Sequence, residues 1–145
     1  MTRIDFYLLS SSEAHQRRVT VCRLIEKAYK QGHQIYLRTS CEEETRVMDD
    51  LLWTFRQGSF VPHEVLNPEL TAEAPVLISH EDDVPAHRDV MINLGDEVPR
   101  GHDQFQRLAE LIDQDPDTKN AGRKRYRAYQ ALGYDIHTHE LGAAD

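Results

Sequence analysis

The chain has 145 residues and a formal net charge of −8, with 39% hydrophobic and 29% charged residues. This length supports one hydrophobic core, so we predict a single domain over residues 1–145. The acidic balance argues against a general nucleic-acid coat. No apolar run is long enough to cross a bilayer and no secretory signal is seen, which predicts a cytoplasmic protein with no membrane contact. Two cysteines, Cys22 and Cys41, are too few for a disulfide framework.

The first half of the chain alternates between apolar runs and amphipathic segments. Its predicted elements are a strand over Ile4–Leu9, a serine-capped helix from Ala14 to about Gln31, a strand over Gln34–Arg38, and a helix that begins after an N-cap at Ser40. Gly32 is placed to end the first helix. Alternation of strand and helix predicts a parallel sheet.

The second half is less regular. Its predicted elements are a short strand over Ser59–Val61, a loop between Pro62 and Pro68, strands over Ala74–Ser79 and Asp89–Leu94, a third helix through Phe105, Leu108, Ala109 and Ile112, and a fourth helix from about Lys119 to Leu132. Asp115–Pro116 is expected to end the third helix, and Gly133 the fourth. Residues 134–145 are expected to form a partly ordered tail. Together the segments predict an α/β fold: a three-layer, mostly parallel sheet with helices on both faces.

The turn after the first strand is where such a sheet would bind a nucleotide. Its sequence, Leu-Ser-Ser-Ser-Glu-Ala, contains no glycine, and Glu13 would repel a phosphate. The turn argues against a nucleotide-using enzyme, and we expect no cofactor. The alternative that stays open is an α/β enzyme that binds a nucleotide at an atypical site.

Trp53 lies outside the apolar stripe of its own predicted helix. The stripe repeats at three- and four-residue spacing through Val47, Met48, Leu51, Leu52 and Phe55. At 100° per residue Trp53 points nearly opposite to it. The residues leave two interpretations of equal weight: an exposed anchor for a partner, or a side chain that another element covers.

Other chemistry-bearing side chains give weaker signals. Cys41 lies at the predicted start of a helix, which favours a thiolate, but three glutamates follow it. The pairs with metal-like or acid–base spacing are His80 with His87, His137 with His139, Asp82 with Asp83, and Asp115 with Asp117. None has a third ligand nearby or a setting that tunes an acid–base pair, so solvated side chains are the simpler interpretation and we predict no metal or catalytic site.

Residues 123–127, Arg-Lys-Arg-Tyr-Arg, invert the local charge of the chain. On a helical wheel Arg123, Tyr126, Arg127 and Gln130 share one side, while Ala128, Tyr129 and Leu132 share a side that can face the core. Two guanidinium groups beside an aromatic ring suit an acidic peptide that also carries an apolar side chain. A phosphate-contacting helix and an ordinary solvated face compete with this interpretation.

The chain resembles the chi subunit family of the bacterial DNA polymerase III holoenzyme from Phe6 to Tyr134. The motifs that carry the resemblance are Leu52-Trp53, Ser59-Phe60-Val61-Pro62-His63, Arg88-Asp89-Val90-Met91-Ile92-Asn93-Leu94, Arg125-Tyr126-Arg127-Ala128-Tyr129 and Gly133-Tyr134. It implies a Rossmann-like or helicase-like fold without a nucleotide site, and a non-catalytic accessory subunit. Such a subunit pairs with the psi subunit of the clamp loader, and another of its surfaces binds the acidic C-terminal tail of single-stranded-DNA-binding protein.

Carried onto this sequence, the resemblance implies a psi-facing surface that contains Trp53 and Phe60, with Val61 and Pro62 shaping its edge. A helicase of the DinG/XPD type is expected to compete for that surface. The subunit would hold the polymerase assembly on the lagging-strand template and contact nucleic acid only through the coat protein.

The tail-binding site implied by the resemblance uses Arg123, Tyr126 and Arg127, with Ile136 as an apolar wall. Arg127 stands where the family also has lysine, which keeps the charge and changes the hydrogen-bond geometry. The match is poor after Gly133, so the resemblance assigns no role to His137, His139 or Glu140. Direct binding of single-stranded DNA by the basic helix is a third possibility.

Overall fold

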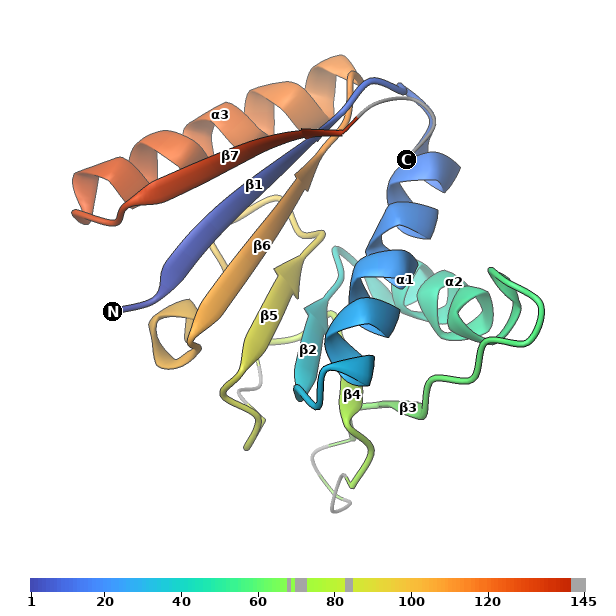
Figure 1. Cartoon of the computed structure of the whole chain (residues 1–145). Coiled ribbons are helices and arrows are strands. Elements are labelled where there is room, and N and C mark those ends of the chain that lie inside the picture. Colours follow the sequence, from blue (N-terminus) through green and yellow to red (C-terminus); the bar gives the residue numbers. More distant parts are fainter. Residues whose placement is uncertain (68, 70–72, 83–84, 142–145) are drawn as a thin grey trace.

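A computed structural model describes residues 1–67, 69, 73–82 and 85–141 of the chain. Seven parallel strands form one sheet in the order β3-β4-β2-β5-β6-β1-β7 (Figure 1). The strands are β1 (Arg3–Leu9), β2 (Ile35–Arg38), β3 (His63–Val65), β4 (Val76–Ser79), β5 (Val90–Asn93), β6 (Arg107–Ile112) and β7 (Ile136–Leu141). The helices are α1 (Ala14–Lys30), α2 (Glu42–Thr54), the short 3-10 helix η1 (His102–Gln104) and α3 (Pro116–Ala131).

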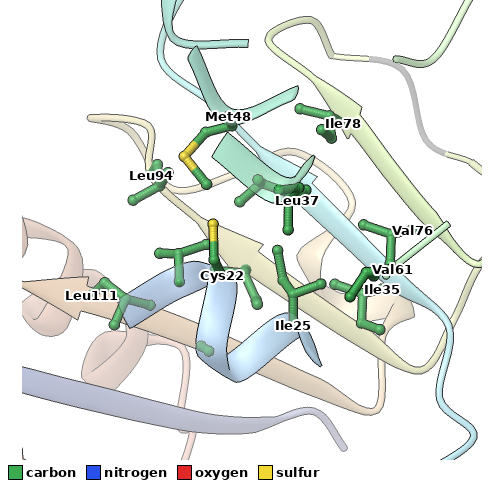
Figure 2. Packing of buried hydrophobic residues seen from close by; sticks show 14 of the residues in the cluster. Cys22, Ile25, Ile35, Leu37, Met48, Val61, Val76, Ile78, Leu94 and Leu111 are labelled. Atoms are coloured by element: carbon green, nitrogen blue, oxygen red, sulfur yellow. The ribbon is translucent and has the colours of Figure 1, made fainter. Parts of the chain in front are cut away.

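Helices cover both faces of the sheet, as predicted. Helices α1 and α2 pack on one face, where the buried cluster includes Val21, Cys22, Met48 and Leu52 (Figure 2). Helix α3 packs on the other face, where Tyr129 joins a second cluster of strand residues. None of the helices in the described part of the chain is long and apolar enough to cross a membrane.

The ends of α1 and α2 differ in detail from the prediction. Glu13 and Cys41 are the N-cap residues, and neither makes a side-chain cap, so the expected caps from the serines before α1 and from Ser40 are wrong. Glu44 in the first turn of α2 instead reaches back and accepts hydrogen bonds from the Ser40 backbone N–H (2.8 Å) and from Oγ (2.9 Å). Gly32 ends α1 as predicted, with a φ of 88° that favours glycine.

The predicted third helix is wrong, because residues 107–112 form strand β6 between β5 and β1. The apolar positions that suggested a helix fit a buried strand equally well, since a central parallel strand is apolar on both faces. Glu110 would have been on the water side of that helix. It is fully buried in the sheet instead.

Two other boundaries also need correction. Ser59–Val61 is not a strand; β3 begins at His63. Asp115 does not end a helix but caps α3: its side chain accepts from the Thr118 backbone N–H at 3.1 Å, and Pro116 takes the first helical position. Pro68, the expected end of the preceding loop, lies outside the described residues.

The expected tail contains a regular strand over Ile136–Leu141. Strand β7 pairs in parallel with β1, with Ile4 opposite Ile136 and Tyr7 opposite His139. The prediction underestimated this segment because its polar residues alternate on a half-exposed edge strand and bury little apolar surface. Residues 142–145 lie outside the described part of the chain.

Candidate functional site

An exposed aromatic pair lies where α2 meets the loop before β3. The Trp53 and Phe60 rings are 5.6 Å apart between centroids, and the two residues keep 47% and 67% of their surface exposed. The structure therefore brings together the two aromatic residues that the resemblance placed on the psi-facing surface. Trp53 is half covered and half exposed, which lies between the two interpretations that the helical wheel left open.

His63 packs its ring against the Trp53 indole, a supporting role that was not predicted. Its ring lies 4.2 Å from the Trp53 ring. Nδ1 lies 2.7 Å from the Val61 carbonyl oxygen and Nε2 lies 2.9 Å from the Asp49 carbonyl oxygen. These two contacts fix the orientation of the imidazole, so Trp53 rests on a rigid surface.

Val61 and Pro62 have different positions at this surface. Val61 is fully buried in the cluster under α1 and α2, so it anchors the loop and cannot itself touch a partner (Figure 2). Pro62 is partly exposed beside it. Of the four residues assigned to the surface, Trp53 and Phe60 expose large apolar side chains.

A buried carboxylate fixes the loop that carries Phe60. Glu26 of α1 is 8% exposed and accepts hydrogen bonds from Arg56 Nη2 at 2.7 Å and from Ser59 Oγ. Burial alone would raise the pKa of Glu26, but these hydrogen bonds and the Arg56 and Lys30 charges outweigh burial and lower it. Glu26 was not predicted, because a charged residue in a helix is expected to be solvated.

A hollow of about 300 Å³ lies between α3 and the ends of β1 and β6, and we call it the α3 hollow. Its lining residues are Phe6, Leu8, Ile112, Asp113, Gln114, Lys119, Gly122, Arg123, Tyr126 and Thr138. Two of the predicted tail-binding residues, Arg123 and Tyr126, meet here. Tyr126 is held by an edge-on contact with Phe6, at 5.2 Å between ring centroids and 66° between ring planes.

The other two predicted residues lie outside the α3 hollow. Arg127 is exposed one helical turn beyond Arg123. Ile136 is half-buried at the start of β7 and packs against the same apolar cluster as Tyr126. Thr138 is the residue of β7 that reaches the hollow.

Eight of the ten lining residues were not predicted, and two of these eight, Lys119 and Gly122, lie on α3 itself. A glycine inside a helix was an available signal, since it often marks a close approach. A Cβ on Gly122 would lie 2.5 Å from Ile112 Cδ1, so the missing side chain lets α3 lie close to β6. That spacing shapes the floor of the hollow.

Arg125, in the middle of the basic segment, is a structural residue. It is 3% exposed and its Nε donates to Glu110 Oε2 at 3.0 Å. On the same helix Leu132, which the wheel assigned to the core side, is 58% exposed. The cationic surface of α3 is therefore formed by the exposed residues Arg123, Lys124 and Arg127.

The histidine pairs with metal-like spacing have separate protein partners. His87 is buried with Nε2 2.9 Å from the Ala74 carbonyl oxygen, whereas His80 Nδ1 lies 3.3 Å from Thr45 Oγ1. His139 Nε2 lies 2.8 Å from Asp5 Oδ1. Within the residues that the structure describes, no three His, Cys, Asp or Glu side chains are grouped to hold a metal ion.

The aromatic pair and the α3 hollow lie toward opposite edges of the sheet. Trp53 is in α2 and Phe60 in the loop that follows it, and α2 packs on β3 and β4. Residues of α3, β1, β6 and β7 line the hollow. Figure 1 shows α2 beside β3 and β4, and α3 beside β1 and β7. Strands β3 and β7 are the two edge strands.

Sequence comparisons match nearly the whole chain to one family. The family described as "DNA polymerase III chi subunit, HolC" matches residues 1–137. The protein named DNA polymerase III subunit chi of Pseudomonas aeruginosa is 39% identical over 141 residues, covering 97% of this chain and 98% of that protein. Proteins of the same name from Haemophilus influenzae and Escherichia coli are 26% and 24% identical, covering 95% and 81% of this chain and 96% and 81% of their own length.

Among solved structures, the crystal structure of T4 UvsW superposes with a TM-score of 0.70 at 8% identity. The match covers 97% of this chain and 42% of that one, and at this identity it concerns the fold alone. It confirms the predicted fold class, and the sequence comparisons confirm the resemblance found in the motifs. The chain belongs to the chi subunit family of DNA polymerase III, whose members are non-catalytic accessory subunits in DNA replication.

Proposed function

We propose that this chain links the clamp loader to coated single-stranded DNA by binding two protein partners at once. The aromatic pair Trp53–Phe60 binds the psi subunit. The α3 hollow, with Arg123 and Lys119 at its rim, binds the acidic C-terminal tail of single-stranded-DNA-binding protein. Both assignments come from the family resemblance, and the geometry supports each as follows.

The exposure and fixed position of the aromatic pair suit a stable contact with another protein. Trp53 and Phe60 are 47% and 67% exposed, while His63 and the Glu26 network hold them in place. Rigid exposed aromatics bind at a low entropic cost and are enriched among residues that dominate interface energies. An apolar segment of psi would cover the pair.

The α3 hollow has the character of a site for a peptide end. Phe6, Leu8 and Ile112 give it an apolar floor that accepts one hydrophobic side chain. Arg123 and Lys119 supply the positive charge that a terminal carboxylate and nearby acidic residues require. Exposed charges of this kind give a salt-sensitive attraction.

The separation of the two surfaces carries the proposal. Because they lie toward opposite edges of one rigid sheet, neither partner obstructs the other. A single subunit then holds the polymerase assembly and the coat protein together. A helicase of the DinG/XPD type that uses Trp53 and Phe60 would exclude psi but leave the tail in place.

The test measures how two variants of the chain bind purified psi and a synthetic acidic tail peptide, and each variant should lose affinity for only one of these ligands. Trp53→Ala should weaken psi binding by about 2 kcal/mol or more, roughly thirtyfold in Kd, and leave the peptide Kd unchanged. Arg123→Ala should weaken peptide binding, more at low salt than at high salt, and spare psi. Loss of both ligands with either variant would contradict the two-surface arrangement.

A further inference from the structure

Among the residues that the structure describes, no helix covers one face of the sheet at the edge formed by β1 and β7. Helix α1 packs mainly over β2 and β6, and α2 over β3 and β4, whereas α3 lies on the opposite face. In Figure 1, β1 and β7 accordingly lie to one side of α1. We call this region the open face.

The register of the strands defines the side chains of the open face. Arg3 lies opposite Arg107, and Tyr7 lies opposite His139, with Asp5 between these two rows. His137 is next to Asp5 on β7 and is exposed. Paired residues of a parallel sheet project to the same side, so these groups share one surface.

Positive charge dominates the open face although the chain is acidic. Asp5 is the one carboxylate that the described parts of β1, β6 and β7 carry on this side, and it is 1% exposed. It accepts hydrogen bonds from Arg3 Nε at 3.2 Å and from Arg107 Nη2 at 3.1 Å. Both arginine side chains remain 47% exposed, so one buried negative charge orients two cations whose outer surfaces meet solvent.

Aromatic surface accompanies this charge. The Tyr7 and His139 rings stack at 4.8 Å between centroids, with 19° between their planes. A hollow of about 180 Å³ adjoins them under the end of α1; Tyr7 and Arg107 line it from the sheet and Lys27 and His33 from the helix side. Lys27 is exposed at its rim and adds a further cation.

We propose that the open face binds single-stranded DNA directly. Arg3, Arg107 and Lys27 can contact phosphates, and the stacked Tyr7 and His139 rings beside them offer a surface to an unpaired base. A compact acidic peptide would need one concentrated positive site, and the α3 hollow already provides that. The open face therefore adds a nucleic-acid contact to the protein contacts of the proposed function and does not depend on them.

The test is fluorescence anisotropy of a labelled oligothymidine of about fifteen nucleotides, without psi or coat protein. Wild type should bind at low salt, and Lys27→Glu should weaken binding roughly fivefold and lower the slope of log K against log salt by about 0.7. Lys124→Glu makes the same change of charge on α3, on the other side of the sheet, and should leave affinity nearly unchanged. His139→Ser, measured at about pH 8, should weaken binding without changing the salt slope.

Three results would overturn the proposal: no binding by wild type at low salt, equal loss with Lys27→Glu and Lys124→Glu, or loss confined to Arg123→Glu. The last result would assign DNA binding to the basic helix instead. Because the tail peptide is absent from the assay, failure here leaves tail capture intact. The peptide Kd of Lys27→Glu, expected to equal that of wild type, shows that the variant is folded.

Discussion

Arg125 of α3 donates a hydrogen bond from Nε to Oε2 of Glu110 on β6, at 3.0 Å and out of contact with water. Tyr129 Oη and Asn93 Nδ2 donate to the same oxygen at 2.6 and 3.0 Å. Three donors, one of them a cation, therefore converge on this one carboxylate oxygen. The ion pair between Arg125 and Glu110 holds α3 against β6.

Removing one partner of this ion pair should destabilise the protein strongly. Arg125→Ala leaves a buried carboxylate without its cation, and we expect the free energy of unfolding to fall by about 3–5 kcal/mol. Lys124→Ala, at an exposed neighbouring position, should change it by no more than about 0.5 kcal/mol. Urea unfolding followed by circular dichroism measures both values. Equal stability of the two variants would show that Arg125 does not fasten the helix.

The same pair shows what the sequence could and could not predict. The strand–helix alternation of the first half of the chain follows from local periodicity and was predicted correctly. Of the stripe predicted on α2, Met48 and Leu52 are buried but Val47 is exposed. Arg125 and Glu110 could not be predicted to pair, because each is polar, and only the sheet–helix packing buries them together. The predicted third helix rested on the spacing of Phe105, Leu108, Ala109 and Ile112, which carries no information about the burial of Glu110.

Likewise, some residues of the candidate sites could be predicted from local patterns, and others could not. Trp53 was found because it departs from a helical stripe, and Arg123 because the positive charges cluster. The open face was missed because Tyr7, Arg107 and His139 come from three distant segments, which only the register of β1 with β6 and β7 brings together. Local patterns carry no information about such pairings.

The two cysteines should differ sharply in reactivity. Cys22 is fully buried between α1 and the sheet, and burial raises the pKa of its thiol to about 12 (Figure 2). Cys41 is a free thiol on the surface at the start of α2. A thiol reagent at about pH 8 should therefore label Cys41 alone in native protein and both residues in urea, because only the thiolate reacts. Rapid labelling of native Cys41→Ser would contradict the burial of Cys22.

Asp5 should contribute stability that depends on pH. Burial acts to raise its pKa, but hydrogen bonds from His139, Arg107 and Arg3 and the Arg107 charge outweigh burial and lower it. A carboxyl whose native pKa lies below its unfolded value of about 3.9 stabilises the fold above that pH, and the contribution is lost as pH falls through the native pKa. The stability advantage of wild type over Asp5→Asn should thus be full near neutral pH and shrink in acid.

Unfolding in urea at a series of pH values measures that advantage. Asp50→Asn, which changes an exposed carboxyl on α2, corrects for the loss of one negative charge. A wild-type advantage that grows as pH falls below about 4 would reverse the sign expected from the arginine contacts.

Glu26 should control the position of Phe60 without touching a partner. Its carboxylate holds Arg56 and Ser59, so Glu26→Gln weakens the hydrogen bonds that order the loop. We expect weaker psi binding, by about 1 kcal/mol, with an unchanged Kd for the tail peptide. Lys30→Ala removes only the longer 3.9 Å contact with Glu26 and serves as the control. Equal psi affinity of Glu26→Gln and wild type would mean that the loop is ordered by other contacts, such as buried Val61.

A substitution at Gly122 should change the shape of the α3 hollow without changing its charge. A Cβ at this position would lie 2.5 Å from Ile112 Cδ1, the end of a flexible side chain, so Gly122→Ala should fold but push Ile112 out of place in the hollow. We expect weaker tail-peptide binding with the same salt dependence as wild type, because no charge changes. Arg123→Ala, in contrast, should lose affinity mainly at low salt. Isothermal titration at two salt concentrations separates the two effects, and Leu132→Ala, at an exposed position at the end of the same helix and on another side of it, is the control. Unchanged affinity of Gly122→Ala would show that the peptide does not enter the hollow and binds only to the charges at its rim.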